Sequence, residues 1–305
     1  MKISTPQGLS RCDNRSIKAI TNQISGGPEN WFTKENLGQL GYKAFTFDFF
    51  VNWERNIFIK TLWFKRFINI NISELIKQPN WKSLITKSLL DADGSDYIND
   101  IYNFCNLYHL TADFVIFNED NWSKDDSIIY ARLNENNIDI KVISIEDLKG
   151  KISFATGGPF YIGRKGLFYS TSRLECHLST TDTPYPGDAD LILTDRDYHI
   201  IALVEFKKHN LNTPISQQKL SNYHPQPDGS KYRRLDMLRK YLPNTSLYTL
   251  YHTTDSRNKT KIELNSYGHI ELGEWNSIEL ASPSDTRIQN EIIDYLIRCT
   301  NFFKS

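Results

Sequence analysis

The sequence predicts an α/β protein with two domains, residues 1–155 and 156–305. Its 305 residues are enough for two domains of about 100–200 residues each. Apolar β-type runs alternate with helical patterns between residues 97 and 148, which is typical of a small parallel sheet. Two further apolar runs around residues 191–206 flank a polar turn, as in a β-hairpin.

The elements of the first half follow from hydrophobic spacing. Residues 43–72 are rich in aromatic and β-branched side chains, which suits strands or a buried aromatic helix. Helical patterns follow, with Ser73 as a candidate N-cap of the first. The predicted helices are 73–90, 97–110 and 126–136, and the predicted strands are 113–117 and 138–145.

The second half begins with a hairpin. Its strands are 191–193 and 200–206, joined by the turn 194–197, and Pro184, Pro186 and Gly187 mark where the first strand starts. The later elements are predicted helices at 215–223, 231–242 and 287–303, and predicted strands at 246–252 and 261–264.

Composition narrows the function classes. The chain carries 36 basic and 36 acidic side chains, so it does not coat nucleic acid by bulk charge. The four cysteines, which are far apart and form no CxxC pair, are predicted to be reduced thiols rather than zinc ligands or disulfides. Neither an apolar leader nor a long apolar run is present, so we expect a cytoplasmic protein that does not associate with membranes.

Acidic and basic side chains gather on the hairpin. Glu205 and Lys207 are two residues apart on one strand, so both point to the same face. Asp188 and Asp190 show the same spacing at the start of the partner strand. The hairpin can therefore bring Asp190 close to Glu205 and Lys207, where an apolar strand would otherwise carry no charge.

This set of side chains suits phosphodiester hydrolysis. Carboxylate oxygens hold Mg²⁺ and leave positions open for water and phosphate. The ion lowers the pKa of its bound water and stabilises charge in the transition state. A neighbouring lysine orients the water or offsets the phosphate charge.

The segments Gly187-Asp188-Ala189-Asp190-Leu191-Ile192-Leu193 and Val204-Glu205-Phe206-Lys207 resemble the core of PD-(D/E)xK nucleases. The resemblance implies a restriction-endonuclease-like mixed β-sheet flanked by helices in the C-terminal half. It also implies Asp190, Glu205 and Lys207 as catalytic residues, with Asp190 and Glu205 binding the metal. The literal Pro-Asp pair is absent, so Asp188 is a second candidate ligand. We favour Asp190 because it directly abuts the apolar strand.

Two more features extend the resemblance. Many family members add an upstream acid, and Glu175 is the nearest candidate for a further metal ligand. RecB-like members place a glutamine and a tyrosine after the lysine strand, and Gln218 and Tyr223 are similar in type but not in spacing. A second Asp-x-Lys triplet, Asp139-Ile140-Lys141, is discounted because the segment before it is predicted to be helical.

Basic residues follow the hairpin. Between residues 205 and 240 there are eight Lys or Arg against three Asp or Glu, which suits a phosphate-tracking surface or, equally, a solvated helix face. The candidate nucleic-acid contacts are Lys208, Gln218, Lys219, Lys231, Arg233 and Arg234.

The sequence thus predicts a Mg²⁺-dependent nuclease, with Mn²⁺ as a substitute and DNA preferred over RNA. By family analogy its role would be restriction, antiviral (phage) defence or DNA processing, carried out as a homodimer that pairs two active sites or as a higher oligomer. The N-terminal domain would serve recognition, sensing or oligomerisation. The alternatives are an RNA-cleaving nuclease and a non-catalytic nucleic-acid-binding or scaffold protein with a nuclease-like fold.

Overall fold

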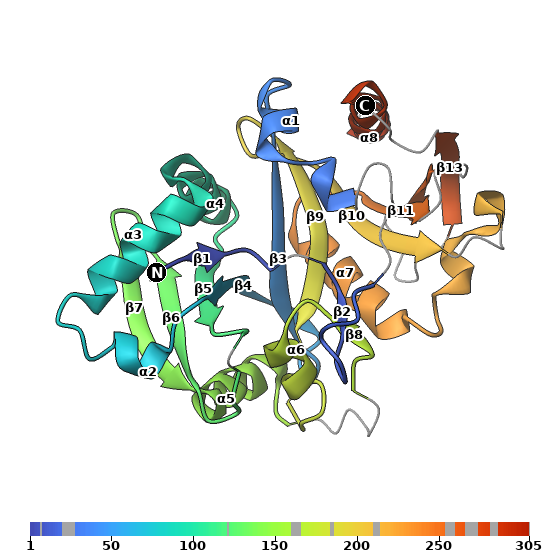
Figure 1. Cartoon of the computed structure of the whole chain (residues 1–305). Helices are drawn as coiled ribbons and strands as arrows, with labels where there is room; N and C mark the ends of the chain where they lie inside the picture. Colours follow the sequence, from blue (N-terminus) through green and yellow to red (C-terminus); the bar gives the residue numbers. More distant parts are fainter. Residues whose placement is uncertain are drawn as a thin grey trace. The chain divides into compact units, whose positions relative to one another are not determined.

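A computed structural model describes residues 1–6, 8–19, 28–120, 122–159, 166–183, 186–209, 214–253, 260–265, 274–280 and 286–304. The chain forms two compact units (Figure 1). Unit 1 comprises Met1–Ala19 and Phe47–Gly187, and unit 2 comprises Ile20–Thr46 and Asp188–Ser305. The units therefore differ from the predicted division at residue 155. Unit 2 includes the N-terminal segment Ile20–Thr46, and its second part begins only at Asp188, in strand β9.

Unit 1 is a mixed α/β structure. Its main strands follow the order β3-β4-β5-β6-β7, where β3 belongs to unit 1 from Phe47 onward, with β1 antiparallel to β4, and a separate pair joins β2 to β8. Only β4 and β5 run parallel among these described strands, so the predicted parallel sheet is mixed instead. The strands are β1 (Ile3–Ser4), β2 (Ser10–Arg11), β3 (Tyr42–Asn52), β4 (Ile57–Ile68), β5 (Thr111–Phe117), β6 (Ser127–Leu133), β7 (Ile138–Ser144) and β8 (Tyr169–Ser170). The helices are α2 (Ile72–Leu75), α3 (Trp81–Asp93), α4 (Ser95–Leu107), α5 (Ile145–Thr156) and α6 (Arg173–Leu178).

Two elements of unit 1 contradict their sequence predictions. The helix predicted at 73–90 is divided into α2 and α3, because Pro79 interrupts the helical pattern, and Asn71 rather than Ser73 is the N-cap of α2.

Residues 126–136 form strand β6 and the turn after it, not a helix. Ile128, Ile129 and Ala131 of this strand are fully buried, and β6 pairs with strands on both sides. Two available partner strands outweighed a weak helical pattern, since strand formation depends on cross-strand packing more than on local preference.

The core of unit 1 packs helices α5 and α6 against aromatic strand residues. Phe50, Trp63 and Val115 belong to one buried cluster with Leu148 and Leu174. The ring centroids of Phe50 and Trp63 lie 4.5 Å apart in an edge-to-face arrangement, which is a favoured geometry for aromatic pairs. Strands β3 and β4 therefore account for the aromatic stretch that the sequence left open between strand and helix.

A disulfide joins two distant parts of unit 1. Cys12 follows β2 and Cys176 lies in α6, and their Cα atoms are 5.4 Å apart. The antiparallel pairing of β2 with β8 brings the N-terminal segment next to α6. The prediction of four reduced cysteines is therefore wrong for this pair, because 164 residues separate them in the sequence and tertiary pairing alone joins them. Cys105 and Cys299 are free.

Unit 2 contains the predicted hairpin. Its strands follow the order β13-β12-β11-β10-β9, and β10 is parallel to β11 while the other described pairs are antiparallel. The strands are β9 (Gly187–Asp195), β10 (Ile200–His209), β11 (Leu247–Thr253), β12 (Thr260–Asn265) and β13 (Glu274–Leu280). The helices are η1 (Pro28–Asn30), α1 (Lys34–Gly38), η2 (Ile215–Gln217), η3 (Leu220–Asn222), α7 (Gly229–Tyr241) and α8 (Thr286–Lys304).

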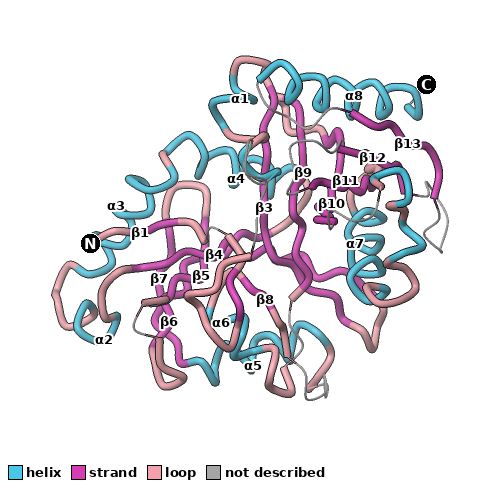
Figure 2. Tube along the Cα trace, turned by 45° about the vertical axis from the view of Figure 1, so that its right-hand side comes forward, coloured by secondary structure: helices cyan, strands magenta, loops and turns pink. Residues whose placement is uncertain are grey.

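Helices α7 and α8 flank the strands of unit 2 (Figure 2). The two faces of this sheet differ in polarity. On one face, Val204, Tyr248 and Leu250 pack with α8 residues such as Ile293 in a buried cluster. Glu205, Lys207 and Thr249 alternate with these residues and point to the opposite face, near α7. The sheet thus keeps an apolar core on one side and a polar layer on the other.

The segment 215–223 is not the predicted α-helix. It forms two short 3₁₀ turns, η2 and η3. The backbone N–H of Leu220 donates to Glu263 Oε1 of strand β12 at 3.0 Å, so this N–H bonds to a side chain of the sheet and not to a helical carbonyl.

Within the part of the chain that is described, no helix combines the length and apolar character that crossing a bilayer requires.

Candidate functional site

The acidic residues of the hairpin meet where β9 and β10 stop pairing. Backbone pairing runs from Thr194–Ile200 to Leu191–Val204. Immediately beyond it, Asp190 Oδ2 accepts the Phe206 N–H at 2.7 Å, so a side chain continues the pairing in place of the backbone. Asp190 is thereby held beside Glu205, as the strand alternation predicts.

Glu205 is fully enclosed, with no exposed surface. Its Oε1 lies 3.0 Å from Lys207 Nζ and 2.8 Å from Lys231 Nζ. These contacts are ion pairs without the alignment of hydrogen bonds, and Oε2 has no hydrogen-bond partner among the described residues. A buried carboxylate oxygen without a partner is costly, so this atom marks a place where a ligand would add stability.

Lys207 is held rigidly next to Glu205. Its Nζ donates to Asp228 Oδ2 at 2.6 Å and lies 5.1 and 5.5 Å from the ring centroids of Tyr223 and Tyr232. Burial alone would lower the pKa of Lys207, but Glu205 and Asp228 raise it above its ordinary value. The side chain therefore remains a fixed positive charge.

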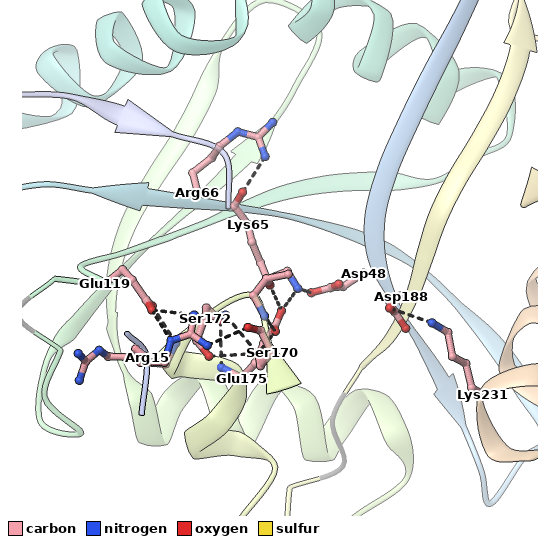
Figure 3. A network of polar contacts seen from close by, with 12 residues as sticks. Arg15, Asp48, Lys65, Arg66, Glu119, Ser170, Ser172, Glu175, Asp188 and Lys231 are labelled. Atoms are coloured by element: carbon pink, nitrogen blue, oxygen red, sulfur yellow. Dashed lines mark hydrogen bonds and ion pairs between the residues drawn. The ribbon is translucent and has the colours of Figure 1, made fainter. Parts of the chain in front are cut away.

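A third carboxylate and a second lysine complete the cluster. Asp188 Oδ2 lies 3.1 Å from Lys231 Nζ, a pair drawn in Figure 3, and Asp190 Oδ1 lies 3.8 Å from the same nitrogen. Burial, followed by repulsion from Glu205, raises the pKa of Asp190 well above its ordinary value. Three carboxylates crowded together with partial desolvation thus favour a bound cation.

Glu175 lies in unit 1, in a network of its own (Figure 3). Its carboxylate accepts hydrogen bonds from Ser170 Oγ, from Thr171 N–H and Oγ1, and from Lys65 Nζ. Lys65 Nζ also lies 3.0 Å from Asp48 Oδ2. Both oxygens of Glu175 are therefore already engaged by groups of unit 1, which gives its predicted role as a further metal ligand no support.

The predicted nucleic-acid contacts divide into two groups. Lys208, Lys219 and Arg233 are exposed and Arg234 is half-buried, on β10, beside η3 and on α7. Gln218 is buried, with Oε1 accepting from the Tyr223 hydroxyl at 3.0 Å, and so it does not present its amide on the surface. Lys231 points into the carboxylate cluster rather than along a basic surface.

The discounted Asp-x-Lys triplet lies on a hairpin after all, because β6 and β7 pair along their length. Its side chains are nevertheless solvent-exposed, with Asp139 at 46% and Lys141 at 69%. The triplet therefore lacks the burial of the Glu205 site, and it stays excluded for a different reason from the one predicted.

A second acidic group lies at the β9–β10 turn. Carboxylate and imidazole atoms of Asp195, Asp197 and His199 are within 4.8 Å of one another. Asp195 Oδ1 accepts the backbone N–H groups of Asp197 and His199, each at 2.9 Å. This group is half-exposed or exposed, and its hydrogen bonds account for it as a stabiliser of the turn.

The sequence pattern does not predict two residues of the site. Asp228, which begins α7, and Tyr232, one turn later, both contact Lys207. Their distance from the hairpin in the sequence hides the contact. The sequence offers one signal for them. Residues 225–229 (Pro-Gln-Pro-Asp-Gly) are typical of a loop that precedes a helix, so a helix start is expected near Asp228.

Fold and site together define a mixed α/β protein with a buried carboxylate–lysine cluster at the end of a β-hairpin. Comparison with protein-family models, with curated proteins and with solved structures found no match. The resemblance to PD-(D/E)xK nucleases consequently rests on the hairpin residues themselves.

Proposed function

We propose that the protein is a divalent-metal-dependent nuclease that hydrolyses DNA, with its site at Asp190, Glu205 and Lys207. The observation that carries the proposal is Glu205. Its carboxylate is fully buried among two lysines and two aspartates, and within the described part of the chain Oε2 lacks a hydrogen-bond partner. A hairpin serving structure alone would gain stability from an apolar residue at this position.

The residues present fit a divalent ion. Asp188, Asp190 and Glu205 offer carboxylate oxygens, the ligands preferred by Mg²⁺ and Mn²⁺. No cysteine belongs to the cluster, and so a soft-metal site is not favoured. Mg²⁺ is the proposed physiological ion and Mn²⁺ its substitute.

The chain's own residues supply the remaining chemistry. A bound ion would lower the pKa of a water molecule and offset charge on the phosphate. Lys207, fixed by Asp228 and two tyrosine rings, supplies a positive charge that needs no reorganisation when negative charge develops on the phosphoryl oxygens. Asp190, anchored by the Phe206 N–H, holds one carboxylate in a fixed orientation.

Exposed basic residues lie on the elements that build the site. Lys208 is on β10 next to Lys207, and Arg233 is on α7 two residues after Lys231. Such residues suit contacts to the phosphate backbone, which give affinity without sequence preference. The chemistry of a carboxylate–lysine cluster suits phosphodiesters of both DNA and RNA. The choice of DNA therefore rests on family analogy alone.

The test compares cleavage of plasmid and single-stranded DNA, and of RNA, by wild type and Lys207→Ala in Mg²⁺, Mn²⁺ or EDTA. Removing one positively charged donor from the reacting phosphate is expected to lower the rate by about 10²–10³-fold. Lys141→Ala is the matched control, since it removes an exposed lysine from the other Asp-x-Lys hairpin.

Full activity in Lys207→Ala would contradict the assigned site. Cleavage of RNA alone would favour the RNA-nuclease alternative. Metal binding without cleavage of any substrate would favour a nucleic-acid-binding protein.

A further inference from the structure

Lys231 extends from the first turn of α7 into the centre of the carboxylate cluster. Its Nζ lies 2.8 Å from Glu205 Oε1, 3.1 Å from Asp188 Oδ2 and 3.8 Å from Asp190 Oδ1. The ammonium thus lies among the oxygens of all three candidate metal ligands.

An ammonium and a divalent ion make the same demand on these oxygens. Mg²⁺ needs carboxylate oxygens at about 2.0–2.1 Å, which is closer than the ammonium contacts, and its ligands must face one common point. Two cations at this point would repel each other strongly in partly desolvated surroundings. The ion and the ammonium therefore cannot share the three carboxylates.

The two lysines of the site differ in freedom. Lys207 is 12% exposed and is held by Asp228 and the rings of Tyr223 and Tyr232. Lys231 is 26% exposed, and its ion-pair partners are the three carboxylates. Its flexible four-carbon stem can carry the ammonium to solvent, whereas Lys207 has partners that do not belong to the metal-ligand set.

We propose that Lys231 is a built-in competitor for the divalent ion: its ammonium occupies the carboxylate cluster and has to withdraw before the ion binds. This inference rests on the metal site of the proposed function and adds a regulatory step to it. The affinity for metal then depends on the difference in free energy between binding the ion and binding the ammonium at the same oxygens. An ion that binds these oxygens weakly does not displace the lysine.

Calorimetric titration with Mn²⁺ in the absence of nucleic acid tests the proposal. Lys231→Gln is expected to bind Mn²⁺ about tenfold more tightly or better, because a charged group at hydrogen-bond distance shifts cation binding to a carboxylate by at least about that factor. Lys231→Arg keeps the positive charge and is expected to stay near the wild-type affinity.

Lys207→Gln separates competition from general electrostatics. It removes the same charge at 3.0 Å from Glu205 Oε1, yet Lys207 has no contact to Asp188 or Asp190 among the described ion pairs. Its effect on Mn²⁺ affinity should be clearly smaller than that of Lys231→Gln. Equal effects of the two variants would overturn the proposal, as would an unchanged or weaker affinity in Lys231→Gln.

A second pair of variants tests the competition if Lys231→Gln folds poorly. If Lys231→Gln is not folded without metal, Asp188→Asn combined with Lys231→Gln removes one charge of each sign and should still bind Mn²⁺ more tightly than Asp188→Asn alone. Failure of that comparison would likewise refute the competition.

DNA cleavage measured in parallel distinguishes the two proposals. Tighter Mn²⁺ binding without cleavage supports the competition and contradicts the nuclease. Cleavage with unchanged Mn²⁺ affinity contradicts only the competition. No Mn²⁺ binding by any of the variants contradicts both.

Discussion

Glu205 shows how the surroundings of a single residue determine its role. Glu205 has the same chemistry as any surface glutamate, but it is fully buried and lies within ion-pair distance of two lysines. Carboxylates at this depth are retained when a positive charge or a metal compensates for lost hydration. The residue therefore carries more weight in the proposed function than the Glu-x-Lys triplet alone.

His177 provides a pH test at the same scale. Burial, and then the positive charges of Lys149 and Lys124, lower the pKa of His177 below its ordinary value. The folded protein thus prefers the neutral ring, whereas the unfolded chain takes up the proton near pH 6.5. This contribution to stability is present above about pH 6.5 and is lost as the pH falls below it.

His177→Gln should flatten the fall in melting temperature between about pH 7 and 5, relative to wild type, because the unfolded variant gains no proton at this position. His177→Asn serves as a second neutral variant and should behave alike. An equal fall in melting temperature with pH for wild type and both variants across this range would contradict the prediction.

Short helices depend strongly on their caps. Helix α6 has six residues and carries both Glu175 and Cys176. Ser172 is fully buried, and its Oγ accepts the backbone N–H of Glu175 at 3.2 Å. This hydrogen bond satisfies one of the donors that a helix start leaves without a partner.

Ser172→Ala should lower the free energy of unfolding by about 1 kcal/mol, the usual cost of losing an N-cap. Urea unfolding at equilibrium measures it. Lys87→Ala, an exposed substitution on α3, is the control and should change stability by less than about 0.5 kcal/mol. A Ser172→Ala variant as stable as wild type would mean that the cap does not hold α6.

A disulfide constrains the chain over a long stretch of sequence. Cys12–Cys176 closes a loop across 164 residues, and it ties the N-terminal segment to α6 of unit 1. Disulfides stabilise chiefly by restricting the unfolded chain, more for longer loops. Such bonds persist in oxidising compartments and are rare in the cytosol, so the disulfide does not support the predicted cytoplasmic location.

Cys12→Ser is expected to destabilise the oxidised protein by about 2–4 kcal/mol in urea unfolding. The difference from wild type should disappear once a reductant is added to both. Cys299→Ser, which changes a free and half-buried cysteine, should not show this dependence on reductant. A difference that survives reduction would assign the effect to side-chain packing instead of the covalent link.

Features that depend on the periodicity of the backbone could be predicted from the sequence. Alternation along a strand places Glu205 and Lys207 on one face, and the hairpin turn brings Asp190 beside them. Helices α4, α7 and α8, and strands β5, β7, β11 and β12, were likewise predicted to within a few residues. These features follow from contacts between residues close in the chain, for which geometry fixes the neighbours in advance.

Contacts between distant segments became known only from the folded structure. Lys231 and Asp228 reach the hairpin from α7, Cys12 meets Cys176, and β6 became a strand because partners flank it on both sides. Glu175, a predicted ligand, is engaged within unit 1. Packing free energy summed over the whole chain selects such contacts, and no local pattern of residues encodes that sum.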